Sequence, residues 1–88
     1  MERVKAQCDR VMQILREERD KRGLSGSKLA DLCGVHQSTV SLLDRGLRQP
    51  SLDTLLRMAE VLEIELGEVL LRASAEEKAK TKGKNTTE

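Results

Sequence analysis

The sequence predicts an all-α fold of five helices, and three observations support this prediction. The 88 residues include no Phe, Tyr or Trp, so leucine and other aliphatic side chains must fill the core. The chain contains a single proline. Its apolar residues recur at spacings of three and four, which is the period of an amphipathic helix. A chain of this length forms one small domain, which we expect to span residues 11–73.

The first predicted helix covers Met1 to Arg22 and ends at Gly23, which suits a left-handed C-terminal cap. Its apolar stripe consists of Val4, Cys8, Val11, Met12 and Leu15. Residues 1–10 are an N-terminal extension of this helix that a small domain does not need. They are either a frayed helix end or, through Val4, Cys8 and Val11, a contact with a partner subunit.

Two short helices and a glycine turn follow. Ser25 is expected to cap the second helix, which runs to about Cys33. Gly34 forms the turn, because a positive φ costs little only without a Cβ atom. The third helix starts at His36 and ends at Gly46. Apolar residues recur through both helices and the turn, at Leu29, Ala30, Leu32, Cys33, Val35, Val40 and Leu43. This is the layout of a helix-turn-helix, whose second helix enters the major groove of duplex DNA.

The C-terminal part of the chain predicts two more helices and a tail. Ser51 is expected to cap a fourth helix with a broad apolar face, and a short fifth helix is predicted from Glu65 to about Leu71. Residues 74–88 have no apolar stripe, so we expect a disordered polar tail. Its lysines at positions 78, 80, 82 and 84 are expected to be solvated, with a phosphate-gripping arm as the alternative.

The net charge of +1 is low for a nucleic-acid-binding protein, but the charge is unevenly distributed. Residues 1–22 carry seven Lys/Arg against five Asp/Glu, and residues 51–75 carry two against five. Binding to DNA needs local positive charge that faces phosphate, not a positive total. No apolar run approaches the roughly 20 residues that span a bilayer, and no secretory leader is evident, so we expect a cytoplasmic protein.

The sequence indicates no metal, cofactor or enzymatic site. Cys8 and Cys33 are far apart and form no C-x-x-C pair, so both are expected to be reduced and packed. Cys33 and His36 have a C-x-x-H spacing, but with one histidine in the chain no four-ligand set exists. His36 is better explained as a helix cap. The sequence contains no recognisable nucleophile with a base, glycine-rich phosphate loop or paired carboxylates, so we expect a non-enzyme.

From Val11 to Leu71 the sequence resembles the Cro/CI-type (XRE-like) helix-turn-helix regulators of bacteria and phage. The resemblance is carried by Ala30, Gly34 and Val40 and by the run STVSLLDRGLRQPSLDTLLRMAEVL. It implies a compact lambda-repressor-like DNA-binding domain without a bound cofactor. It also implies a structural ion pair between Arg19 and Asp44, where the family more often has Glu, that ties the first helix to the recognition helix.

Two positions depart from the family pattern. Gly26 stands at the start of the second helix, where many members have a Gln that holds a phosphate. Leu42 stands where members commonly direct a polar or basic residue toward the groove. Both changes weaken the case for DNA binding, although Leu42 is able to contact a thymine methyl group.

The predicted DNA contacts lie on the third helix and the loop after it. Gln37 is the first candidate for reading a base, because its amide both donates and accepts and so matches adenine N6 and N7. Ser38, Ser41 and Leu42 are the other base-reading candidates. Contacts to phosphate are expected from Thr39, Arg45, Arg48 and Gln49. The alternative is that these are ordinary surface residues that make no contact with DNA.

The sequence therefore predicts a transcriptional regulator, most simply a repressor, that binds double-stranded DNA at a pseudo-palindromic operator as a homodimer. The predicted dimer contact is made by Leu66, Val69 and Leu70 of the fifth helix, unless these residues close the core. No membrane or small-molecule partner is indicated. The alternative is a protein-interaction module of the same fold, antitoxin-like or a coregulator, that has lost most DNA binding.

Overall fold

The computed structural model describes residues 2–85, with side chains through Glu76, and this range contains five helices and no strand. The helices are α1 (Glu2–Lys21), α2 (Gly26–Cys33), α3 (Gln37–Asp44), α4 (Leu52–Leu62) and α5 (Leu66–Asn85). The all-α prediction with five helices is confirmed. No helix in the described range is long and apolar enough to cross a membrane.

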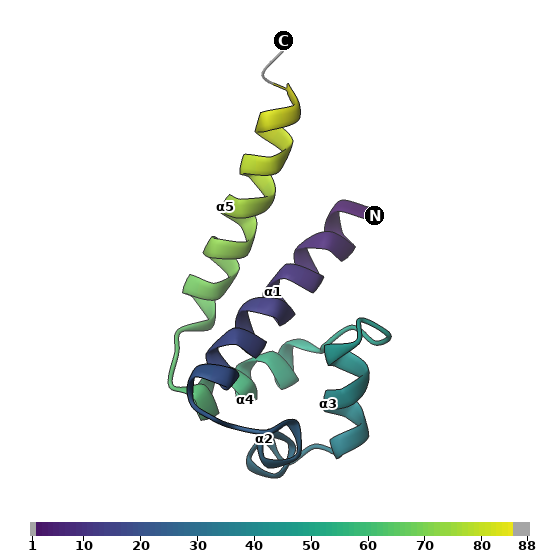
Figure 1. Ribbon diagram of the computed structural model, residues 1–88, viewed down its shortest axis with the longest axis vertical. Coiled ribbons are helices and arrows are strands. Elements are labelled where there is room, and N and C mark those ends of the chain that lie inside the picture. Colours follow the sequence, from purple (N-terminus) through teal and green to yellow (C-terminus); the bar gives the residue numbers. More distant parts are fainter. Residues whose placement is uncertain (1, 86–88) are drawn as a thin grey trace.

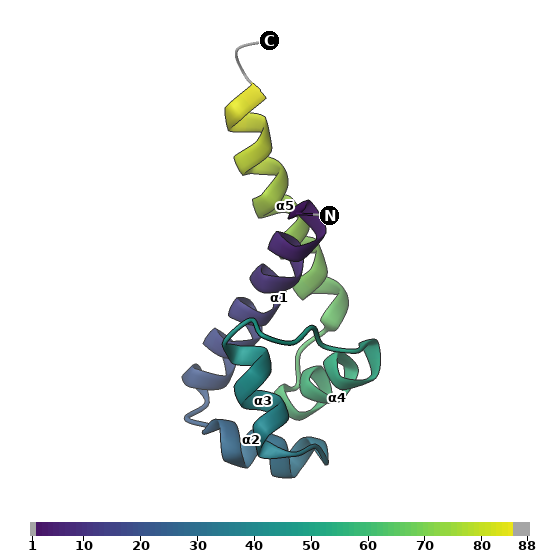
Figure 2. The same ribbon diagram turned by 90° about the vertical axis from the view of Figure 1, so that its right-hand side faces the viewer.

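The helices form a compact lower part and an elongated upper part (Figure 1). Helices α2, α3 and α4 pack around the C-terminal half of α1, while α5 runs beside α1 and continues past its N-terminus. The molecule is therefore elongated, with extents of 48 × 24 × 20 Å. Helices α3 and α5 lie on opposite sides of the domain, as the two perpendicular views in Figures 1 and 2 show.

One aliphatic core joins all five helices. Its largest fully buried side chains are Ile14, Val40, Met58 and Leu62, from α1, α3 and α4. Most of the rest of the core comes from the predicted apolar stripes: Val11, Met12, Leu15, Leu29, Ala30, Cys33, Leu43, Ala59, Leu66 and Val69. Ile14 and Ala73 are also buried, and they were not among the predicted apolar positions. Removal of this apolar surface from water is the main force that holds the helices together.

The helix ends follow the predicted capping chemistry. The hydroxyls of Ser25 and Ser51 accept hydrogen bonds from the amides of Lys28 (3.0 Å) and Thr54 (3.1 Å). These caps satisfy amides that have no partner inside the helix. Gly23 follows α1 with a φ of +67°, a left-handed conformation that suits glycine.

Helix α5 differs from the predicted fifth helix in length and in the use of its apolar residues. Leu66 and Val69 are 8% and 4% exposed and belong to the core, so of the three predicted interface residues only Leu70, at 43%, is exposed. The helix also continues from Ser74 to Asn85, where we expected a disordered tail. Residues 86–88 of that tail lie outside the described residues.

The additional length of α5 is explained by helix propensity and by one ion pair, and neither of these requires an apolar stripe. Residues 75–80 read AEEKAK, and Ala, Glu and Lys are among the strongest helix formers. An ion pair between Arg10 on α1 and Glu76 on α5 also holds the two helices together beyond the last core residue, Ala73. At the other end of the chain, residues 2–10 also form regular helix, as the first turns of α1, and not a frayed end.

Candidate nucleic-acid interface

The turn between α2 and α3 is fixed by Gly34. Its φ of +73° and ψ of +29° place it in the left-handed region. Its amide donates to the carbonyl of Asp31 (3.2 Å), and the next amide, of Val35, donates to Ala30 (3.0 Å). These bonds satisfy the last carbonyls of α2 and reverse the chain so that α3 starts at once. Leu29, Ala30, Val40 and Leu43 then bury the inner sides of both helices.

His36 caps the start of α3, as expected from the sequence. Its Nδ1 atom accepts from the amide of Ser38 (3.4 Å) and lies 3.0 Å from the Ser38 hydroxyl. Cys33, its partner in the C-x-x-H spacing, is only 4% exposed and packs in the core. The two side chains therefore serve separate structural purposes. A further consequence is that the Ser38 hydroxyl already has a partner, which lowers its availability to a base.

The outer side of α3 presents polar side chains. Gln37, Ser38, Ser41 and Arg45 are exposed, whereas Thr39 and Leu42 are half-buried. Gln37, Ser41 and Arg45 follow one another at intervals of four residues, so they form a row along one side of the helix. The loop after α3 exposes Arg48 and Gln49. The structure thus places the predicted contact residues on α3 and on the loop that leaves it.

The row of polar residues on α3 borders a shallow hollow of about 360 Å³, built from three helices. Val40 and Asp44 of α3 also line it, and its other walls are Arg16 from α1 and the segment Ser25–Ser27 at the start of α2. The first amides of a helix carry a partial positive charge, which favours a nearby anion such as phosphate. Gln37, Ser41 and Arg45 therefore face a guanidinium group and a helix N-terminus across this hollow.

Arg16 is the contact candidate that sequence reasoning missed. It lines this hollow and also a second one of about 360 Å³, between α1 and the end of α3, together with Asp44 and Arg45. The signal was present in the sequence, since Arg16 lies three residues before Arg19 and therefore on nearly the same side of α1. Because the resemblance pairs Arg19 with Asp44 of α3, the helical period alone would have placed Arg16 beside the recognition helix.

Arg19 and Asp44 join α1 to the end of α3. Arg19 Nη2 donates to Asp44 Oδ2 (3.0 Å) and Nη1 to Oδ1 (3.4 Å), so the carboxylate accepts from both ends of the guanidinium fork. The arginine is 7% exposed as a residue and the Asp44 side chain 17%. The shorter aspartate thus reaches this arginine with both oxygens. The pair fixes the orientation of α3 on α1.

Gly26 lies close to this pair. A Cβ atom built on Gly26 would lie 3.4 Å from Val40 Cγ1 and 4.0 Å from Arg19 Nη1. Both distances are ordinary van der Waals contacts, so the position accepts a side chain. With glycine present, the start of α2 offers only backbone amides to a ligand in the hollow.

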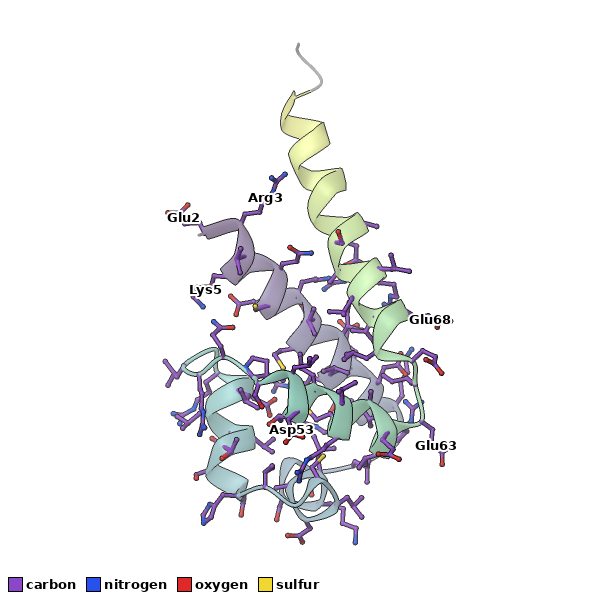
Figure 3. The ribbon with its side chains drawn as sticks, turned by 180° about the vertical axis from the view of Figure 1, so that it is seen from behind. Glu2, Arg3, Lys5, Asp53, Glu63 and Glu68 are labelled. Carbon is purple, nitrogen blue, oxygen red and sulfur yellow. The ribbon has the colours of Figure 1, made fainter. Side chains whose placement is uncertain are left out.

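Three arginines lie around the recognition helix. Arg16, Arg45 and Arg48 lie around α3. Acidic residues occur at the other end of the domain, where Glu63 marks the turn from α4 to α5 and Glu68 extends outward from α5 (Figure 3). Local positive charge, and not the small net charge, is what matters for a phosphate near α3. Asp44 also borders the hollow, but its carboxylate is paired with Arg19.

Comparison with known proteins agrees with this geometry. A helix-turn-helix family model (HTH_3) matches residues 15–69, which covers α2, α3 and α4 completely. An uncharacterised HTH-type transcriptional regulator of Mycobacterium tuberculosis is 33% identical over 68 residues, which are 77% of this chain and 49% of that protein. An HTH-type transcriptional regulatory protein of Thermococcus kodakarensis is 36% identical over 66 residues, 73% of this chain and 21% of that protein. The chain therefore spans at most about half the length of these curated relatives.

Two solved structures are similar along most of the chain. The restriction-modification controller protein C.AhdI of Aeromonas hydrophila has a TM-score of 0.64 and 40% identity, covering 72% of this chain and 94% of that one. The clp gene regulator ClgR of Corynebacterium glutamicum has a TM-score of 0.75 and covers 92% of this chain and 86% of that one, and its 21% identity makes it a likeness of fold. The family model covers more than half of the chain, and this chain therefore belongs to the XRE-like helix-turn-helix family.

Proposed function

We propose that this chain is a sequence-specific repressor that inserts α3 into the major groove of a pseudo-palindromic operator. The observation that carries the proposal is the hollow in which Gln37, Ser41 and Arg45 of α3 meet Arg16 and the start of α2. A recognition helix in the major groove needs phosphate contacts on both sides of it to fix its register. The hollow supplies such contacts from two other helices.

Within this arrangement, Gln37 reads a base. It is the first residue of α3 and is exposed, and the early residues of a recognition helix are those that reach base edges. Its amide matches the N6 and N7 atoms of adenine. Ser41, one turn later, is the next base contact, and the half-buried Leu42 packs on a thymine methyl. Ser38 contributes less because its hydroxyl is already bonded to His36.

The phosphate contacts lie at the two ends of the α3 surface. Arg45, Arg48 and Gln49 hold the strand next to the end of α3, and Thr39 contacts a phosphate from the first turn of the helix. Arg16 and the amides of α2 hold the strand across the hollow. Because few cations take part, the affinity is modest and its dependence on salt is shallow compared with strongly basic regulators.

A palindromic operator requires a homodimer, in which two copies of α3 enter successive major grooves. The half-sites then lie about 10 bp apart, centre to centre. Repression by occupying a promoter needs nothing beyond this DNA-binding domain. Two copies related by a two-fold axis would read the two halves of one site with the same residues.

Selection of binding sequences from random duplexes tests the proposal directly. The wild-type chain should enrich a palindrome, and the double variant Gln37→Ala, Arg48→Ala should lose that enrichment while remaining folded by circular dichroism. A matched control is Arg3→Ala, because Arg3 is exposed at the far end of α1 (Figure 3). Failure of the wild-type chain to enrich any sequence at low salt would reject DNA reading.

That outcome would favour a second candidate, a protein-interaction module of the same fold, either antitoxin-like or a coregulator. Two observations support it. Gly26 leaves the start of α2 without a side chain that donates to phosphate, and Leu42 adds no polar group to the face of α3.

A further inference from the structure

His36 and Ser38 form a side-chain pair at the start of the recognition helix. The hydroxyl oxygen of Ser38 lies 3.0 Å from His36 Nδ1, and the amide nitrogen of Ser38 lies 3.4 Å from the same atom. Both residues are exposed, at the end of α3 that reaches base edges in the proposed complex. A serine hydroxyl donates or accepts according to what its neighbour does, so this pair has a chemical consequence beyond capping.

The backbone determines which ring nitrogen of His36 carries the proton. The Ser38 amide is a fixed donor, so Nδ1 of the neutral imidazole must be the acceptor and the proton must lie on Nε2. A hydroxyl oxygen that lies 3.0 Å from an unprotonated nitrogen has to donate, since two lone pairs would otherwise face each other. The hydroxyl hydrogen of Ser38 is therefore directed at His36 while the imidazole is neutral.

The lone pairs of the Ser38 hydroxyl remain for a ligand. With its hydrogen held by His36, the hydroxyl is able only to accept a further hydrogen bond. In the major groove the amino groups of adenine (N6) and cytosine (N4) donate, whereas O6 of guanine and O4 of thymine accept. Ser38 is thus set to favour an amino base over a keto base on the strand that it contacts.

We propose that His36 determines the base preference of Ser38, by holding its hydroxyl as a hydrogen-bond acceptor for adenine or cytosine. This inference rests on the proposed function and deepens it, since it names the class of base that one position of α3 selects. The contact is weaker than that of Gln37, because a single hydrogen bond replaces a bidentate one. His36 acts through Ser38 and is a positioning residue.

Protonation of His36 changes the roles within the pair. The charged imidazole carries hydrogens on both nitrogens, so Nδ1 donates to the Ser38 oxygen and the hydroxyl hydrogen is released. Ser38 is then able to donate as well as accept, and it no longer distinguishes amino bases from keto bases. Histidine ordinarily changes its charge between pH 5 and 8, so the base preference at this position should weaken with acidity in that range.

The charged residues around the turn leave the His36–Ser38 pair undisturbed. They are Lys28 and Asp31 on α2, Asp44 and Arg45 at the end of α3, and Asp53, Arg57 and Glu60 on α4. Asp44 is paired with Arg19, and Asp53 is paired with Arg57. Within the part of the chain that the structure describes, the only side chain hydrogen-bonded to His36 is that of Ser38. The ring therefore exchanges roles with Ser38 without breaking a bond to another side chain.

Nuclear magnetic resonance of the full chain without DNA tests the direction of the hydrogen bonds. The sequence contains one histidine, so the imidazole signals need no assignment. Long-range proton–nitrogen correlation above pH 8 should show the proton on Nε2 and an unprotonated Nδ1. A proton on Nδ1 of the neutral ring would overturn the inference, whatever the protein does with DNA.

Binding to the sequence selected from random duplexes tests the base preference. Ser38→Ala identifies the base pair, because it should lose discrimination there and keep it at the base pair read by Gln37. The wild-type chain should prefer the amino base at this position about fivefold at pH 8, the effect of one hydrogen bond, and about twofold or less at pH 5.5. Fluorescence anisotropy with duplexes that differ at this base pair measures the ratio of affinities, from which any general effect of pH cancels.

His36→Asn is the conservative variant. Asparagine also caps helices, and its side-chain oxygen takes the place of Nδ1 as an acceptor but gains no proton in this pH range. It should keep the preference at both pH values, whereas His36→Ala should abolish the preference at both. A preference that is constant with pH in the wild type, or that survives His36→Ala, would reject the inference and leave the DNA-reading function standing. A chain that enriches no duplex would reject that function and the inference with it.

Discussion

The guanidinium group of Arg19 holds both carboxylate oxygens of Asp44, at 3.0 and 3.4 Å, across the contact between α1 and α3. The arginine is almost fully buried and its Nε atom has no hydrogen-bond partner among the described residues. Its positive charge therefore depends on this one carboxylate, and the orientation of the recognition helix depends on the pair.

Asp44→Ala should lower the free energy of unfolding by about 3 kcal/mol, because it leaves a buried guanidinium without a counter-charge. Urea denaturation followed by circular dichroism measures the loss. The double variant Arg19→Met, Asp44→Leu should recover most of it, since apolar side chains of similar volume often replace a buried ion pair without a net loss. Equal stability of Asp44→Ala and the wild type would show that the pair contributes little.

Gly26→Gln should tighten DNA binding about tenfold, because it adds an amide donor at the start of α2 where only backbone amides now face the hollow. Gly26→Ala is the matched control: it adds a Cβ atom in ordinary contact with Val40 but no donor, and its affinity should stay near that of the wild type. Fluorescence anisotropy with the selected operator measures both. Equal affinities for the two variants would argue against a phosphate in the hollow.

Arg16→Ala should weaken binding to all duplexes alike and reduce the slope of log K against log salt by about 0.9, the value for losing one phosphate contact. Salt titrations of operator and unrelated duplexes provide the measurement. Arg3→Ala is the control, since Arg3 is exposed at the far end of α1 (Figure 3). An unchanged salt slope in Arg16→Ala would remove Arg16 from the interface.

The stabilising contribution of Glu18 to the folded domain should be lost in acid. Its side chain, 16% exposed, accepts from Arg22 (2.8 Å) and Lys21 (3.4 Å), and Arg72 of α5 lies 3.9 Å away. The hydrogen bond from Arg22 holds the pKa of the Glu18 carboxyl below its usual range, against the opposing effect of burial and with the help of Lys21.

Because the folded pKa is lower than the unfolded one, the stabilisation is complete above the unfolded value of about 4.3 and is lost as the pH falls through the folded value. Thermal melts of wild type and Glu18→Gln between neutral and acidic pH should therefore converge in acid. A constant difference between the two proteins across this range would rule out the contribution of Glu18.

The two cysteines should react at very different rates. Burial raises the pKa of the Cys33 thiol, despite the opposing charge of Arg57, so little thiolate is present and reagents cannot reach it. Cys8 is half-buried in a groove that Val4 and Leu70 also line. Peptide mass spectrometry after brief treatment with iodoacetamide at low protein concentration should find Cys8 modified and Cys33 intact, and denaturant should expose both.

The parts of the fold that sequence reasoning predicted well are those set by local chemistry. The apolar period identified the inner sides of α2 and α3, and Ser25, Gly34 and Ser51 marked helix ends, because capping and positive φ each require particular side chains. The length of α5 was not predicted, since beyond Ala73 the helix rests on intrinsic propensity and on the pairing of Arg10 with Glu76 rather than on an apolar stripe.

The candidate interface was predicted only where it lies within α3. Gln37, Ser41 and Arg45 follow from one helical period, whereas Arg16 joins them only because α1 crosses α3, and packing between helices is not local. Leu66, Val69 and Leu70 show the same limit. Their apolar character was evident, but the position of α1 beside α5 decides that two are buried and one is exposed.

Helix α1 is unbroken from Glu2 to Lys21. Val4 and Cys8 line the groove at one end, and Arg16 contacts the hollow beside α3 at the other, about 18 Å further along at 1.5 Å per residue. Because α1 has no break between these two positions, it holds the groove and the hollow at a fixed separation. In the proposed homodimer, such a rigid subunit fixes the distance between the two α3 helices. An operator lengthened by one base pair between its half-sites should therefore bind poorly.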